Sequence, residues 1–167
     1  MMAMAVSATL AGQPFQASDR VLVRYVLDGD TFEADRVGRV RLLGIDAPEI
    51  GRGLETSEPF AHEARQRLTG LITARWVRLE YDEPRRDTYR RSLAYVFLEN
   101  GTFVNAVLVR DGLARVSAGR MLTRLTDLRR AERDAQLFRR GMWGERPSLP
   151  LERYVLPRTR PNQRRRR

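Results

Sequence analysis

Three short apolar runs near the beginning of the chain are joined by links of only a few residues, and these links constrain the fold most. Residues 21–27 are rich in Val and Leu and end at Asp28-Gly29, a dipeptide typical of tight turns. Residues 31–35 and 39–45 form the next two runs. Parallel neighbours would need long crossover connections, so the short links favour an antiparallel meander over a βαβ fold.

The rest of the chain predicts one helix between strands and two helices after them. Apolar residues within 60–72 recur with the helical period, and the runs 76–81 and 93–98 have the length of strands. Two later helices are expected, at about residues 102–111 and 122–140, each followed by a glycine. Five short strands with a helix between the third and fourth match the OB-fold, a five-stranded Greek-key β-barrel, here within an α+β domain that has about three α-helices.

Composition divides the chain into three parts. Residues 1–19 are small and apolar but make an unconvincing signal peptide, so we interpret them as either a signal remnant or a disordered leader. The folded domain is expected to span residues 20–146, with Trp76 and Trp143 in its core. In residues 147–167 prolines alternate with arginines and apolar residues thin out, which predicts a disordered tail.

Composition also limits the chemistry. The chain has no cysteine and one histidine, His62, which excludes thiolate sites and a multi-histidine zinc site within one chain. A bound metal would therefore be a hard cation held by oxygen. The net charge is +10 and every basic residue is arginine, which pairs with phosphate in bidentate fashion. Residues 151–167 hold seven of the arginines, so the folded part is only mildly basic.

Acidic residues lie at the ends of the first and third apolar runs, and arginines lie nearby. Asp28 and Asp30 flank the first turn, Asp46 and Glu49 follow the third run, and Arg91 opens a later one. Taken alone, each cluster is more typical of a turn with solvated charges. Together, in a basic protein, they suggest a metal-assisted site that acts on a phosphodiester.

Four segments, in order and with compatible spacing, resemble the staphylococcal nuclease (thermonuclease) family. They are Asp-Gly-Asp-Thr at 28–31, Arg-Leu-Leu-Gly-Ile-Asp-Ala-Pro-Glu at 41–49, Asp-Thr-Tyr-Arg-Arg-Ser-Leu-Ala-Tyr at 87–95, and Asn-Ala-Val-Leu-Val-Arg-Asp-Gly-Leu-Ala at 105–114. The resemblance covers roughly residues 20–144. A lone Asp-Gly-Asp is weakly specific, whereas four ordered blocks are strongly specific. The resemblance implies an OB-fold nuclease that hydrolyses DNA and RNA with calcium and leaves 3′-phosphate ends.

The resemblance also assigns a metal site. Asp30 and Asp46 resemble the carboxylates that bind calcium in the family. Ala47 stands where the best-known member has Thr, at a position that binds the metal through its backbone carbonyl, so the change of side chain costs little. Two carboxylates alone bind calcium weakly, and we expect the substrate phosphate to complete the site.

The remaining site residues follow from the same resemblance. Glu49 resembles the residue that positions or deprotonates the attacking water. Arg41 and Arg91 resemble the two catalytic arginines that bind the phosphate, and Tyr89 resembles a tyrosine that hydrogen-bonds a phosphate. One departure concerns residues 115–120, which lack the base-packing tyrosines of the best-known member, so affinity and base preference are expected to differ.

Two other functions remain open from the sequence. A non-catalytic OB-fold module that binds nucleic acid is the main alternative, although it predicts gaps among the site residues and this chain has none. A basic interaction protein that works through its arginine-rich tail is the third. We expect a monomer that takes DNA or RNA as substrate and has no membrane span; the resemblance slightly favours a secreted or periplasmic protein.

Overall fold

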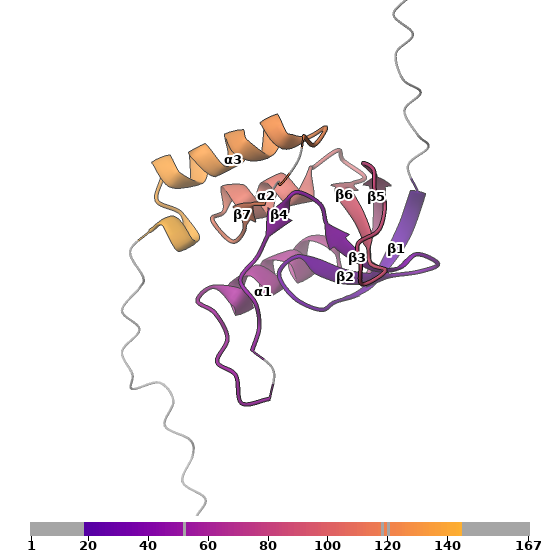
Figure 1. Cartoon of the computed structure of the whole chain (residues 1–167), viewed down its shortest axis with the longest axis horizontal. Helices are drawn as coiled ribbons and strands as arrows, with labels where there is room; N and C mark the ends of the chain where they lie inside the picture. Colours follow the sequence, from indigo (N-terminus) through magenta and orange to yellow (C-terminus); the bar gives the residue numbers. More distant parts are fainter. Residues whose placement is uncertain (1–18, 52, 118, 120, 145–167) are drawn as a thin grey trace, which may run out of the picture.

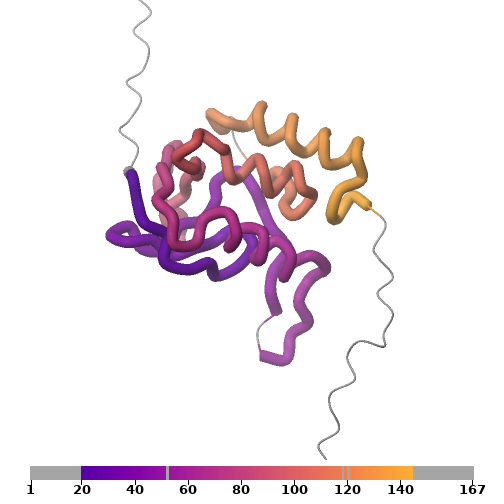
Figure 2. Tube along the Cα trace, turned by 180° about the vertical axis from the view of Figure 1, so that it is seen from behind, coloured from indigo at the N-terminus to yellow at the C-terminus, as the bar shows by residue number. Residues whose placement is uncertain are grey.

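The computed structural model describes residues 19–51, 53–117, 119 and 121–144 (Figure 1). The expected tail, and the expected leader except for Asp19, therefore lie outside the described residues. None of the helices in the described part is long and apolar enough to cross a membrane. The segment between β4 and α1 projects away from the rest of the domain, which Figure 2 shows from behind.

Five strands close into a barrel in the order β1-β2-β3-β6-β5. Their bounds are Asp19–Val26 (β1), Thr31–Ala34 (β2), Gly38–Leu42 (β3), Trp76–Glu80 (β5) and Ser92–Leu98 (β6). All pairs are antiparallel except β3 with β6. The short strand β4 (Ile45–Asp46) and helix α1 (Ala61–Ile72) lie between β3 and β5 along the chain. Helices α2 (Val104–Arg110) and α3 (Leu125–Leu137) follow β6. The expected OB-fold barrel with three α-helices is confirmed.

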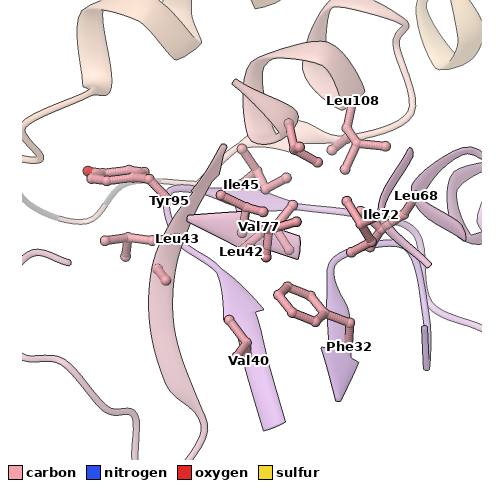
Figure 3. Close-up of a cluster of buried hydrophobic side chains, with 14 of the residues drawn as sticks. Phe32, Val40, Leu42, Leu43, Ile45, Leu68, Ile72, Val77, Tyr95 and Leu108 are labelled. Atoms are coloured by element: carbon pink, nitrogen blue, oxygen red, sulfur yellow. The ribbon is translucent and has the colours of Figure 1, made fainter. Parts of the chain in front are cut away.

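Alternate residues of the strands fill the barrel. Phe32, Val40, Leu42 and Val77 point into it and are at most 1% exposed (Figure 3). Two side chains of α1 that lie one helical turn apart, Leu68 and Ile72, pack against the same cluster (Figure 3). The Trp76 prediction is wrong, because this residue is 48% exposed and carries Arg20 over its ring. It lies on the outward-pointing register of β5, next to the inward-pointing Val77.

The third predicted strand is shorter than expected. It ends at Leu42, and the chain turns at Gly44 before the two-residue strand β4 (Ile45–Asp46) pairs with β7 (Arg115–Val116). Gly44 has a left-handed φ of 79°, and a Cβ there would lie 2.7 Å from a Leu128 methyl group of α3. Glycine permits both the conformation and the close packing. As a result, Asp46 lies outside the barrel, in a separate two-stranded sheet.

The last helix is also shorter than predicted. It begins at Leu125 and ends at Leu137, and residues 141–143 form a 3-10 turn, η1 (Gly141–Trp143). The residues just before α3 are held in a turn, because the backbone N–H and the hydroxyl of Thr123 both donate to Asp82. The helix therefore starts after this contact with the chain ahead of β6.

One buried amide holds the segment after β3 against the barrel. Asn105 in α2 is fully buried, and its side-chain amide donates to the carbonyl of Leu43 at 2.9 Å. Its oxygen accepts from the backbone N–H of Val96 in β6 at 3.0 Å. Asn105 thus fixes the chain that leads from β3 to Asp46.

Candidate active site

One guanidinium joins the two acidic clusters. Arg41 Nη1 donates to Asp30 Oδ1 at 2.7 Å, and Nη2 donates to Asp46 Oδ1 at 2.6 Å. The strand register explains the first contact, because Thr31 of β2 pairs with Arg41 of β3 and Asp30 immediately precedes Thr31. The turn at Gly44 returns the chain for the second contact. The structure therefore brings together three of the predicted site residues.

Asp30 is the buried member of this group, at 2% exposure. Besides the Arg41 contact, its Oδ1 accepts from the Thr31 hydroxyl at 2.8 Å and its Oδ2 from the Ala47 backbone N–H at 3.2 Å. Burial raises the pKa of Asp30 to about 7; Arg41 opposes this rise and the charge of Asp28 adds to it. Asp28 also accepts from the Asp30 backbone N–H, which fixes the turn.

The donor set around Asp30 fits a hard cation. Carboxylate oxygens of Asp30 and Asp46 accept from the two terminal nitrogens of one guanidinium, and the backbone N–H of Ala47 donates to Asp30. A buried carboxylate with a raised pKa is stabilised by additional positive charge, and oxygen ligands suit Ca²⁺. No group of three or more His, Cys, Asp or Glu side chains suited to a metal occurs within the described residues. Water or substrate oxygen would therefore have to supply the remaining ligands.

Arg91 is held in place by Asp87, four residues earlier. The Arg91 side chain donates from Nε to Asp87 Oδ2 at 2.6 Å, and its backbone N–H donates to Oδ1 at 2.9 Å. Burial acts to raise the pKa of Asp87, but the hydrogen bonds and charge of Arg91 outweigh it, so this pKa lies below its ordinary value. Asp87 also accepts from the backbone N–H of Tyr89.

Tyr89 and Arg91 form a second group of side chains, just before β6. The Cζ atom of Arg91 lies 5.3 Å from the centroid of the Tyr89 ring, which is 80% exposed. Because Val40 pairs with Ser92, Arg91 enters beside β3, the strand that carries Arg41. In the part of the chain that the structure describes, no hydrogen bond links Arg91 or Tyr89 to Asp30, Asp46 or Arg41. Arg91 and Tyr89 therefore lie near the group formed by Asp30, Arg41 and Asp46 but are not part of its hydrogen-bond network.

Glu49 lies at the base of the projecting loop, with its side chain exposed. Its backbone N–H donates to Glu58 Oε2 at 3.0 Å, and its carbonyl accepts from the Glu58 backbone N–H at 2.9 Å. This reciprocal contact closes the loop and fixes the Glu49 backbone. Within the described residues, the Glu49 carboxylate makes no hydrogen bond to another site residue.

Three supporting residues were not predicted to have a role. Glu58 holds the Glu49 backbone across a nine-residue separation, and no local pattern signals such a contact. Asp87 stands at i, i+4 to Arg91, a spacing that could have marked the pair. The contact of the Thr31 hydroxyl with Asp30 could have been predicted from the Asp-Gly-Asp-Thr block, in which the two residues are adjacent. Of the residues that replace the missing tyrosines, 118 and 120 lie outside the described residues.

The amino-acid sequence is similar to those of several known proteins. The sequence profile described as "Staphylococcal nuclease homologue" matches residues 39–145. Thermonuclease of Staphylococcus hyicus is 34% identical over 122 residues, which cover 71% of this chain and 72% of that protein. Thermonuclease of Staphylococcus intermedius is 42% identical over 97 residues, covering 56% and 57% of the two chains. Endonuclease YncB of Bacillus subtilis (strain 168) is 36% identical over 115 residues, covering 64% and 54%. The chain thus spans a little over half of the latter two.

Proposed function

The chain belongs to the staphylococcal nuclease homologue family, and from this premise we propose that it is a nuclease, a hydrolase that cleaves phosphodiester bonds in DNA, RNA or both. The finer proposal is a calcium-dependent reaction that leaves 3′-phosphate ends. The observation that carries the nuclease proposal is the Arg41 guanidinium, which joins the carboxylates of Asp30 and Asp46. Relatives named thermonuclease and endonuclease support the same reaction class.

Hydrolysis of a phosphodiester places extra negative charge on the non-bridging oxygens. We assign Arg41 and Arg91 to bind these oxygens, because charge-assisted hydrogen bonds strengthen as the charge develops. Tyr89 would add a hydroxyl to the same phosphate. Asp87 keeps Arg91 in position through its paired hydrogen bonds. The arginines therefore supply transition-state stabilisation without giving up a proton.

The attacking water needs a base, and Glu49 is the carboxylate assigned to it. Asp30 and Asp46 accept hydrogen bonds from Arg41, whereas the exposed Glu49 carboxylate makes no hydrogen bond to another site residue within the described residues. General-base assistance is typically worth about 10²–10⁴-fold in rate. The Glu58 contact to the Glu49 backbone limits the positions that this carboxylate can reach.

Asp30, Asp46 and the backbone carbonyl of Ala47 are the residues that would hold calcium. When bound, calcium supplies Lewis-acid stabilisation of charge on the phosphoryl oxygens. Arg41 donates to both carboxylates in the protein alone, so the same carboxylate oxygens serve either the guanidinium or a cation. Substrate phosphate offers Arg41 an equivalent pair of oxygen acceptors.

The test is cleavage of a labelled single-stranded oligonucleotide with calcium and then with excess chelator, for both the unchanged chain and Glu49→Gln. We expect cleavage only with calcium and only by the unchanged chain, with 3′-phosphate products identified by mass spectrometry. Binding without calcium-dependent cleavage would contradict the nuclease and favour the non-catalytic binding module. Products with 5′-phosphate ends would contradict the finer proposal alone.

A further inference from the structure

A cavity of about 510 Å³ lies directly beside the proposed active site. Its wall is formed by β4, β7, the ends of the projecting loop and the 3-10 turn η1, and it includes Asp46, Glu58, Phe60, Arg115 and Met142. This volume is in the range of pockets that bind small organic ligands. The cavity is separate from Tyr89, Arg91 and Asp87, none of which lines it.

Asp46 belongs to both the cavity and the proposed site. Its carboxylate accepts from Arg41 at 2.6 Å, and the same residue lines the cavity. The pairing of β4 with β7 places Arg115 directly opposite Asp46. A polynucleotide whose scissile phosphate lies at Arg41 would therefore have this cavity beside it, at Asp46.

Arg115 brings a positive charge to the wall of this cavity. Its Nε atom donates to the Met142 sulfur at 3.0 Å, and its Cζ atom lies 5.1 Å from the Trp143 ring centroid. A thioether is a weak acceptor, and a ring face leaves the in-plane N–H groups available. Arg115 has no carboxylate partner within the described residues. The contacts thus orient the Arg115 guanidinium, which forms no ion pair among the described residues.

Phe60 supplies an aromatic wall. It precedes α1 in a left-handed conformation, with a φ of 71°, and makes no side-chain cap for the helix. Such a conformation is uncommon for a bulky residue and is characteristic of positions constrained by a ligand or a tight turn. An aromatic face is the usual platform for stacking a base of single-stranded nucleic acid.

The two carboxylates at the cavity decide how a nucleotide would lie in it. Asp46 and Glu58 would repel a phosphate placed against them, whereas both accept hydrogen bonds from base amino groups and sugar hydroxyls. Arg115 attracts the phosphate. A nucleotide therefore fits with its phosphate at Arg115 and its base or sugar toward Glu58 and Phe60.

We propose that this cavity is a nucleotide subsite for the residue adjacent to the scissile phosphate. Arg115 binds the neighbouring phosphate and Phe60 packs against the base. This inference rests on the proposed nuclease function. Arg115 would contribute to the affinity for a polymer and not to the chemical step, so its effect depends on whether the substrate has a second phosphate.

Two substrates separate these contributions. Single-stranded octanucleotide has neighbouring phosphates, whereas bis(p-nitrophenyl) phosphate is a diester with no nucleoside and no second phosphate. For Arg115→Gln we expect KM for the octanucleotide to rise about tenfold, the low end for a lost hydrogen bond to a charged group. KM and kcat for the small diester should stay unchanged. Phe60→Leu, which keeps the pocket apolar, should raise KM for the octanucleotide only. Arg130→Gln, the same change on α3 outside the cavity, serves as the control.

Binding is measured in parallel in the Glu49→Gln background, by fluorescence anisotropy of the labelled octanucleotide. Loss of one phosphate contact should reduce the slope of log K against log salt by about 0.7 for Arg115→Gln. Equal effects of Arg115→Gln and Arg130→Gln would overturn the inference, and so would equal effects on the two substrates. A chain that binds but never cleaves would refute the proposed function, while this salt comparison would still decide the subsite.

Discussion

The guanidinium of Arg41 donates to Asp30 at 2.7 Å, and Asp30 is almost completely buried at the end of the first turn. A buried carboxylate is costly unless it is paired, and Arg41 is its only ion-pair partner among the described residues. The same arginine is assigned to the substrate phosphate. The Arg41 guanidinium thus stabilises the buried Asp30 carboxylate in the protein alone, and it is assigned to catalysis when substrate is bound.

The first prediction follows from this shared role. Arg41→Ala should lower kcat by about 10²–10³-fold, the usual cost of removing one donor to developing charge. The same change should tighten calcium binding at pH 8, because it removes a cation that competes for the carboxylate oxygens. Isothermal titration calorimetry measures the second effect. Arg39→Ala, an exposed change on the same strand, should alter neither. Weaker calcium binding by Arg41→Ala would show that the arginine does not compete.

A second prediction separates the proposed base from the residue that positions it. Glu49→Gln should lower kcat by about 10²–10⁴-fold. Glu58→Ala should lower kcat by a smaller factor, because it removes only the bond to the Glu49 backbone. Glu55→Ala, an exposed change in the same loop, is the control. A kcat for Glu49→Gln no lower than that for Glu58→Ala would assign the base elsewhere.

A third prediction concerns acid and the contact between Asp87 and Arg91. The pKa of Asp87 is lower in the folded protein than its ordinary value of 3.8, so its contribution to stability is present above pH 3.8 and is lost as the pH falls through the folded pKa. Asp87→Asn should lower the free energy of unfolding at pH 7 by about 1.5 kcal/mol. This difference between the two proteins should shrink below pH 3.8.

Urea unfolding of both proteins at several pH values measures this difference. A matched change on the same segment is Glu83→Gln, an exposed residue, which should leave the free energy of unfolding unchanged at each pH. The Asp87→Asn variant should also raise KM for an oligonucleotide, since Arg91 loses its fixed position. A difference that persists undiminished at low pH would show that Asp87 does not act through its charge.

Patterns along the chain were enough to predict the barrel and the central residues of the candidate site. Strand-length runs with short links predict the meander, and the ordered blocks place Asp30, Arg41 and Asp46 together. What the sequence could not supply is contact between distant segments. The β4–β7 pair has two residues in each strand, too few for any periodicity, and Glu58 meets Glu49 across a loop.

The residues that escaped prediction share a physical cause. Burial of a polar group depends on what surrounds it in three dimensions, and Asn105 sits in a run whose apolar neighbours predict only a helix. Trp76 shows the reverse, because a large apolar residue at the beginning of a strand can face either side of the barrel. The side that it faces is set by Val77, whose place inside the barrel determines the alternation.

The last prediction tests the buried amide that anchors the segment leading to Asp46. Asn105→Ala would leave the Leu43 carbonyl and the Val96 N–H without their partner, and each buried unpaired group costs about 1–3 kcal/mol. We therefore expect the free energy of unfolding to fall by about 3 kcal/mol. Asn100→Ala, an exposed turn residue, should cost less than about 1 kcal/mol. Urea unfolding with and without calcium measures both, and equal losses in the two variants would contradict an anchoring role for Asn105.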